Sequence, residues 1–127
     1  MTYQEVMDKI NEKIDRLGIS KEKLAGEIQL HPTRINRILK GDSCMIYTYL
    51  DLLDEVGLEL QINNIQVIRK HQDLIDCVNK TDYDQMKVWS DSKVQMTTIR
   101  SFIRGENVQT AKVFQILKAM GLEVRVI

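Results

Sequence analysis

Apolar residues in the first part of the chain recur at spacings of three and four, which is the pattern of amphipathic helices. Thr2, with an acidic residue three positions later, forms a capping-box sequence and opens the first such stretch. Gly18 suits the C-terminal cap of that helix, and Ser20 can cap the next one. Pro32 favours the first position of a third helix, which ends at Gly41.

A fourth helix and a strand complete this half of the sequence. The helix is expected over 47–56 and stops at Gly57. Residues 58–62 then alternate strictly between apolar and polar side chains, which predicts a half-buried strand. The first half of the chain therefore predicts four helices followed by one strand.

The second half of the chain repeats the pattern of the first. A shift of 64 positions brings apolar residues and glycines into register over two stretches, 34–41 on 98–105 and 53–62 on 117–126. A repeat at a fixed period indicates a duplicated structural unit. We predict two units, residues 1–63 and 64–127, joined by little more than Asn63-Asn64.

The second unit is expected to follow the same order of elements. We predict helices over about 65–78, from Asp82 or Asp84 onward, over 96–104 and over 110–120, and a strand over 122–127. Trp89 is expected in the core, because its counterpart Ala25 should face a neighbouring helix. The two strands are expected to pair, within one chain or between two chains, because a lone strand leaves its backbone groups open. The predicted fold is mainly α, with two tandem units and paired trailing strands.

Composition narrows the classes of function. The 127 residues carry 18 Lys and Arg against 18 Asp and Glu, which excludes a polybasic, non-specific binder of nucleic acid but allows a specific one. The charge divides unevenly: the first unit holds 8 basic and 11 acidic residues, and the second holds 10 and 7. No apolar run approaches the roughly 18–20 residues that cross a bilayer, and the first residues lack a signal-peptide pattern. We therefore expect a cytoplasmic protein that does not use a membrane.

The sequence offers no sign of catalysis or of a bound metal or cofactor. It contains no Gly-rich phosphate loop, no His-Glu-x-x-His and no Gly-x-Ser-x-Gly. His31 is read as a helix cap, and His71 as a surface residue without a partner at metal-ligand spacing. Cys44 and Cys77 are read as reduced core residues. Tyr47 and Tyr49 could contact a backbone phosphate or pack against the rest of the protein, and both readings stay open.

A short helix, a tight turn and a second short helix that ends at a glycine form a helix-turn-helix layout. Segment 20–41 carries this layout, with Leu24-Ala25 on the first helix, Ile35 on the second and Lys40-Gly41 at its end. It resembles the Xre, or lambda-repressor-like, family of DNA-binding domains, and segment 84–105 resembles that family more weakly. The trailing strand is similar to that of antitoxin-type members, in which it helps to form the dimer. The chain departs from the family pattern at the turn, which usually contains Gly and here contains Gln29 and Lys93.

The resemblance implies a DNA-contacting surface on both units. In the first unit it implies contacts to base edges from the third helix, by Pro32, Thr33, Arg34 and Arg37. It also implies a phosphate contact by Lys40, and further contacts by Ser20 and Lys21 at the start of the second helix. The counterparts in the second unit are Gln85, Met96, Thr97, Thr98, Ser101 and Arg104. The second surface is less cationic, although Thr and Met side chains can contact a thymine methyl group.

These features favour a sequence-specific regulator of transcription, a repressor or antitoxin-like protein that binds duplex DNA as a single-chain pseudo-dimer. Its unequal reading helices predict an asymmetric site. One alternative is an adaptor or inhibitor that keeps the fold but binds a protein, such as a toxin or a nuclease. Another is a homodimer whose strands pair between chains and which uses one unit of each chain on DNA.

Overall fold

The protein is described here by a computed structural model that covers residues 2–63 and 66–127. Within these residues it is mainly helical, as predicted. The first half contains α1 (Tyr3–Leu17), α2 (Lys21–Glu27), α3 (Pro32–Leu39), α4 (Ile46–Glu55) and β1 (Leu60–Ile62). The second half contains β2 (Gln66–Ile68), α5 (His71–Lys80), α6 (Gln85–Ser92), α7 (Met96–Ile103), α8 (Thr110–Ala119) and β3 (Val124–Val126).

Local capping sets the helix boundaries that the sequence predicts. The Thr2 hydroxyl accepts a hydrogen bond from the backbone N–H of Glu5, and Gly18 ends α1 in the left-handed conformation at φ 66°. The Ser20 hydroxyl accepts from the backbone N–H of Lys23 at 3.1 Å and opens α2. In the second half, Asp84 rather than Asp82 caps α6. These contacts satisfy N–H groups that lack an intrahelical partner.

The prediction of a helix over 65–78 is wrong at the N-terminal end of that range. Residues 66–68 form the strand β2, α5 begins at His71, and Ile65 and Asn64 lie outside the described residues. Two interactions explain the difference. The β-branched pair Val67 and Ile68 lies beside β1 in the sheet, and the Asp73 carboxylate accepts from the backbone N–H groups of Arg69 and Lys70 at 3.1 Å each. That capping places the first turn of the helix after residue 70.

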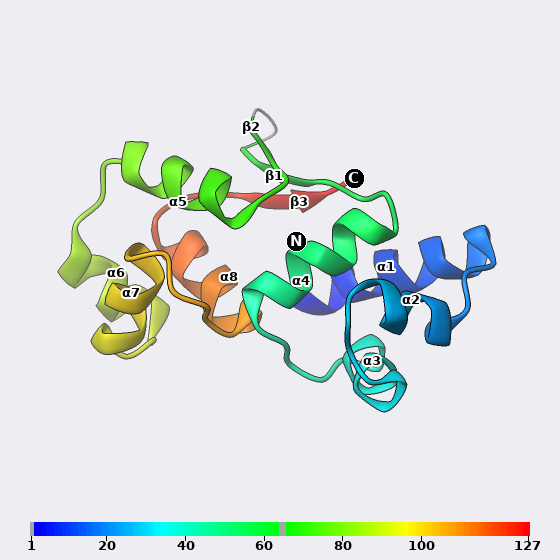
Figure 1. Ribbon diagram of the computed structural model, residues 1–127. Coiled ribbons are helices and arrows are strands. Elements are labelled where there is room, and N and C mark those ends of the chain that lie inside the picture. The colour runs from blue at the N-terminus through cyan, green and yellow to red at the C-terminus, as the bar shows by residue number, and fades with distance from the viewer. Residues whose placement is uncertain (1, 64–65) are drawn as a thin grey trace.

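The three strands form one antiparallel sheet in the order β2-β1-β3. The trailing strands of the two halves pair within the chain, as one of the two open readings predicts, and Gln61 lies opposite Arg125. Figure 1 shows the sheet on one side of the molecule, with α3 and α7 on the side away from it.

A second contact joins the two halves below the sheet. The backbone N–H of Ile46 donates to the carbonyl oxygen of Val108, and the N–H of Thr110 donates to the carbonyl oxygen of Cys44, at 2.8 Å each. Exchanging each residue with its counterpart 64 positions away converts one bond into the other. Such reciprocal bonds are what a two-fold relation between two similar units produces.

The buried side chains of both halves form one continuous hydrophobic core. Tyr49 and Phe102 are fully buried, and the Tyr49 ring contacts Phe114 edge-on with centroids 5.7 Å apart. Cys44 and Cys77 are buried free thiols, as predicted. Of the two tyrosines left open, Tyr49 therefore packs.

The prediction that Trp89 lies in the core is wrong, because its side chain is 46% exposed. α2 packs against α3 and buries Leu24 and Ala25. The corresponding helix α6 packs instead against α8 and buries Val88 and Ser92. This change of packing partner turns the Trp89 position outward.

Candidate nucleic-acid interface

The helix α3 has one buried face and one exposed face. Ile35, Ile38 and Leu39 are buried, whereas Thr33 is exposed. The His31 Nδ1 atom accepts a hydrogen bond from the backbone N–H of Thr33 at 3.2 Å, so His31 is the helix cap that the sequence predicts. Pro32 follows as the first residue of the helix and is half-buried. The cap and the buried face fix which side chains α3 presents to solvent.

Arg37 and Lys40 form the cationic part of this exposed face. Both residues are exposed, and their side chains make no hydrogen bond or ion pair with any other described residue. They lie three positions apart, which places them on neighbouring turns of one helix face. Both charges are therefore available to an external anion.

Arg34 is arranged differently. Its Nη2 atom donates to the carbonyl oxygen of Ser43 at 2.8 Å, and its Nη1 atom lies 3.6 Å from the Asp42 carboxylate. The Tyr3 hydroxyl donates to the carbonyl oxygen of Asp42 at 3.1 Å and ties the same loop to α1. Arg34 thus lies against the loop that follows α3.

Two predicted contact residues lie at the start of α2, the helix that packs against α3. Lys21 is exposed, and Ser20 is exposed with its hydroxyl oxygen already used in the helix cap. The Ser20 hydroxyl proton stays available for an acceptor, because the cap uses only the oxygen.

The helix α7 carries the corresponding residues of the second half. Ile99 and Phe102 are buried, and Thr97 is exposed. The other predicted residues are half-buried: Met96, Thr98 and Ser101 on α7, and Gln85 at the start of α6. Arg104 follows the helix and is bound by the Glu106 carboxylate, with Nη2–Oε2 and Nε–Oε2 distances of 2.9 and 3.1 Å. This hydrogen bond, together with one from Ser101, lowers the pKa of the Glu106 carboxyl.

Sequence reasoning missed three charged residues at these two helices. Arg100 is exposed on α7 and its side chain makes no hydrogen bond or ion pair with the rest of the described chain. Asp42 and Glu106 each bind an arginine of the predicted surface. Asp42 and Glu106 both lie one residue after the glycine that ends the helix, so the 64-residue repeat in the sequence is a signal that could have identified them.

The turns before α3 and α7 have left-handed backbone geometry without glycine. Gln29 has φ 60° and Lys93 has φ 59°. These are the positions at which the chain departs from the family pattern, so the backbone there adopts a conformation that a glycine would take without steric cost.

The first half also holds the end of α7 in place. The backbone N–H of Tyr47 donates to the Asn107 side chain at 3.0 Å, and the Tyr47 hydroxyl donates to the carbonyl oxygen of Gly105. The Tyr47 ring packs edge-on against His71, with centroids 4.6 Å apart. His71 is thus not the surface residue that the sequence predicts: its Nε2 atom is buried without a hydrogen-bond partner among the described residues, and burial lowers its pKa.

Comparison of the chain with protein-family models, curated proteins and solved structures found no match to any of them. The residues themselves therefore carry the functional argument. Among the residues that the structure describes, no group of three or more His, Cys, Asp and Glu side chains is placed to hold a metal ion. No helix in this part of the chain has the length and apolar character needed to cross a membrane.

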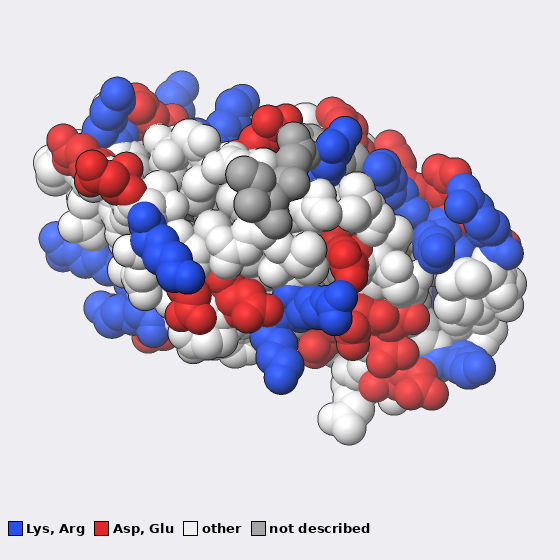
Figure 2. Space-filling view, turned by 90° about the horizontal axis from the view of Figure 1, so that it is seen from above, with Lys and Arg blue, Asp and Glu red and all other residues white. Residues whose placement is uncertain are grey.

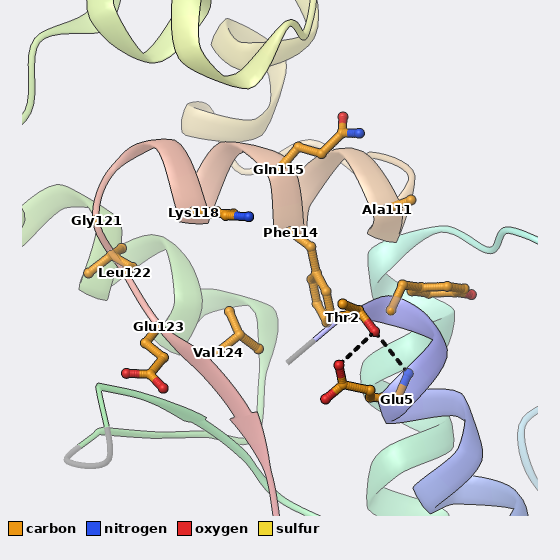
Figure 3. Close-up of a pocket in the computed structure, with 11 residues that line it drawn as sticks. Thr2, Glu5, Ala111, Phe114, Gln115, Lys118, Gly121, Leu122, Glu123 and Val124 are labelled. Atoms are coloured by element: carbon orange, nitrogen blue, oxygen red, sulfur yellow. Dashed lines mark hydrogen bonds between the residues drawn. The ribbon is translucent and has the colours of Figure 1, made fainter.

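Two other surfaces lie away from this interface. A hollow of about 690 Å³ opens between the start of α1, α8 and β3, with Phe114, Leu122 and Val124 among its lining residues (Figure 3), and none of the predicted DNA-contacting residues lines it. Figure 2 shows the sheet side of the molecule, where basic and acidic side chains are interspersed. No large surface of one sign gathers on that side.

Proposed function

We propose that the protein is a sequence-specific regulator that binds duplex DNA with the exposed face of α3, as lambda-repressor-like proteins do. The observation that carries this proposal is the pair of exposed, unpartnered cations on that face, Arg37 and Lys40. A helix of this kind fits the major groove, which is about 12 Å wide. A cytoplasmic location is part of the same proposal.

The chemistry of the residues assigns them different roles. Arg37 can donate two hydrogen bonds to the O6 and N7 atoms of a guanine, and Lys40 can neutralise a phosphate. In the second half, Met96, Thr97 and Thr98 suit contact with thymine methyl groups, and Arg100 adds a cation. The expected operator therefore has two unequal half-sites.

The reciprocal contacts between the two halves support a single-chain pseudo-dimer. Dimeric helix-turn-helix proteins place two reading helices about one turn of DNA apart, roughly 34 Å, on a pseudo-palindrome. A covalent tandem makes the second contact intramolecular, so binding does not depend on association of two chains. Because β1 and β3 pair within the chain, the proposal needs no strand pairing between chains.

Selection from a random duplex library tests this proposal. We expect enrichment of sites with two unequal halves, and binding of the enriched duplex should exceed that of a shuffled duplex at 150 mM salt. A library that yields no sequence preference after repeated rounds would contradict specific DNA binding.

One observation favours a second candidate, an adaptor or inhibitor that binds a protein. Met86 and Trp89 lie three positions apart on α6 and are 60% and 46% exposed. Large exposed aromatic residues are enriched where proteins bind each other. Co-expression with a candidate partner, for example a toxin or a nuclease, tests this candidate. Trp89→Asp should abolish co-purification, whereas Arg37→Ala should leave it intact.

A further inference from the structure

Two acidic residues occupy the same position in the two halves of the molecule. Asp42 follows Gly41 at the end of α3, and Glu106 follows Gly105 at the end of α7. Each carboxylate binds an arginine of the predicted DNA-contacting surface: Asp42 lies 3.6 Å from Arg34, and Glu106 lies 2.9 Å from Arg104. The arginines themselves come from different positions of the repeat. The shared element is therefore the acid, not the pair.

We propose that Asp42 and Glu106 restrain DNA binding by occupying arginines that phosphates would otherwise contact. For Arg34 this role replaces the base-edge contact that the resemblance implies, because its guanidinium lies against the loop after α3. This inference rests on the proposed function. A guanidinium presents its planar fork of N–H donors to a carboxylate and to a phosphate in the same way. A phosphate that uses the same donors must therefore displace the carboxylate, and a phosphate that binds the remaining N–H groups of Arg34 or Arg104 still lies close to the carboxylate charge.

The exposure of these pairs makes that displacement feasible. The Arg34 and Asp42 side chains are 41% and 57% exposed, and the Arg104 and Glu106 side chains are 63% and 54% exposed. Ion pairs this accessible to water are weak, so DNA can replace them. The displaced carboxylates nevertheless stay close to the phosphates and repel them.

The consequence is weaker binding to every duplex, without a change in the preference for the operator. Contacts to phosphates strengthen binding to every duplex, whereas contacts to base edges strengthen binding to the operator alone. A restraint on two phosphate-binding arginines therefore lowers the affinity for the operator and for random duplexes by about the same factor, and the base contacts that we assign to Arg37 then supply a larger share of the binding free energy.

The two restraints should differ in strength. Arg34 keeps its 2.8 Å hydrogen bond to the carbonyl oxygen of Ser43 when Asp42 loses its charge. Arg104 keeps only a 3.4 Å contact with the Ser101 hydroxyl among the side-chain bonds described here. Removal of the Glu106 charge therefore releases its arginine more completely.

The test measures the affinity of Asp42→Asn, Glu106→Gln and the double variant for a random-sequence duplex and for the selected operator. The matched control is Glu12→Gln, which removes a carboxylate from another exposed pair, Arg16–Glu12 at 2.7 Å on α1. We expect about two- to fivefold tighter binding to the random duplex for each variant, the scale of an exposed ion pair. The gain should be larger for Glu106→Gln, and both gains should exceed that of the control.

The dependence on salt distinguishes a new phosphate contact from a general change of net charge. Each released arginine should make the log–log slope more negative by about one, and the affinities for the operator and for the random duplex should rise together, with their ratio unchanged. Variants that bind no tighter than Glu12→Gln, while the native protein binds its operator, would overturn the restraint and leave the proposed function intact. Weaker binding by the variants would overturn it too, because the acids would then orient the arginines. If neither the native protein nor the double variant binds any duplex, both proposals fail.

Discussion

Met45 pairs with Gln109, the residue that holds the same position 64 places later in the sequence. Gln61 lies opposite Arg125 in the sheet, and these two residues are also 64 places apart. A position that pairs with its own counterpart lies on the axis that exchanges the two units. The bridge and the sheet therefore mark two points on one approximate two-fold axis. That axis relates α3 to α7, so the two helices hold corresponding positions in the molecule.

The left-handed turns should gain stability from glycine. Gln29 and Lys93 have φ of 60° and 59°, a conformation in which a Cβ atom is strained. Gln29→Gly and Lys93→Gly should each raise the free energy of unfolding by about 0.5–1 kcal/mol, after the entropy that glycine adds to the unfolded chain is subtracted. Urea unfolding measures both values. Lys87→Gly, inside α6, is the matched control and should lower the stability by about 1 kcal/mol. Similar losses of stability in all three variants would contradict the proposed backbone strain at Gln29 and Lys93.

Loss of the side-chain hydroxyl should have opposite effects on the free energy of unfolding at two neighbouring tyrosines, Tyr3 and Tyr49. The Tyr49 hydroxyl is buried and has no hydrogen-bond partner in the described structure, whereas the Tyr3 hydroxyl donates to the carbonyl oxygen of Asp42 at 3.1 Å. An unsatisfied buried hydroxyl costs free energy, so Tyr49→Phe should be neutral or stabilising by about 1 kcal/mol. Tyr3→Phe should destabilise by about 1 kcal/mol. Thermal and urea unfolding compare the two, and a larger loss for Tyr49→Phe would contradict the assignment.

Protonation of His71 should weaken the fold in mild acid. Burial holds its pKa in the folded protein below the ordinary value, which is about 6.5 in the unfolded chain. The unfolded state then binds more protons, so this contribution to stability is present above about pH 6.5 and is lost as the pH falls through the range below it. Urea unfolding at pH 7.5 and at pH 5.5 measures the loss. His71→Phe should remove this part of the pH dependence, and His31→Asn, which keeps a capping residue, should retain it. An equal loss in both variants would exclude His71 as the source.

Local interactions explain which parts of this fold could be predicted from the sequence. Thr2, Gly18 and Ser20 set the ends of α1 and α2 through contacts within a few residues, and those boundaries are predicted correctly. The strand β2 depends on pairing with β1, so the apolar pattern at Val67 and Ile68 resembled part of a helix. Likewise, the exposure of Trp89 depends on the packing of α6 against α8, which no local pattern encodes.

The residues of the candidate interface likewise divide into those whose exposure local spacing predicts and those whose contacts it does not predict. The spacing of Ile35 and Ile38 already predicts that Arg37 lies on the outer face of its helix. The capture of Arg34 by Asp42 could not be predicted, because it depends on how the loop after α3 folds back beside the helix. Spacing along a helix therefore predicts exposure, whereas ion pairs formed through loops require the tertiary structure.

Binding to DNA should weaken steeply as salt increases. Lys and Arg side chains release condensed counterions when they neutralise phosphates. About four to six phosphate contacts give a log–log slope of roughly −4 to −5, which fluorescence anisotropy at 50–200 mM salt can measure. An affinity that stays constant over this range would contradict electrostatic contact with the backbone.

The two reading helices should differ in their contribution to operator binding. Arg37 is exposed and makes no side-chain bond within the described structure, so Arg37→Ala removes a possible bidentate base contact and should cost about 1–3 kcal/mol of binding free energy. Its counterpart Ser101 already interacts with Arg104 at 3.4 Å and holds only a hydroxyl, so Ser101→Ala should cost less.

The comparison between these two positions is matched, because each lies one turn before its glycine stop and unfolding curves can verify that both variants fold. Arg37→Ala should also relax the preference at one base pair of the operator, whereas Ser101→Ala should leave the preferences there unchanged. Equal losses would indicate a symmetric reader and would contradict the asymmetric pseudo-dimer. No loss from either variant would move the binding face away from these helices, and the exposed Trp89 surface would then be the first place to search for a protein partner.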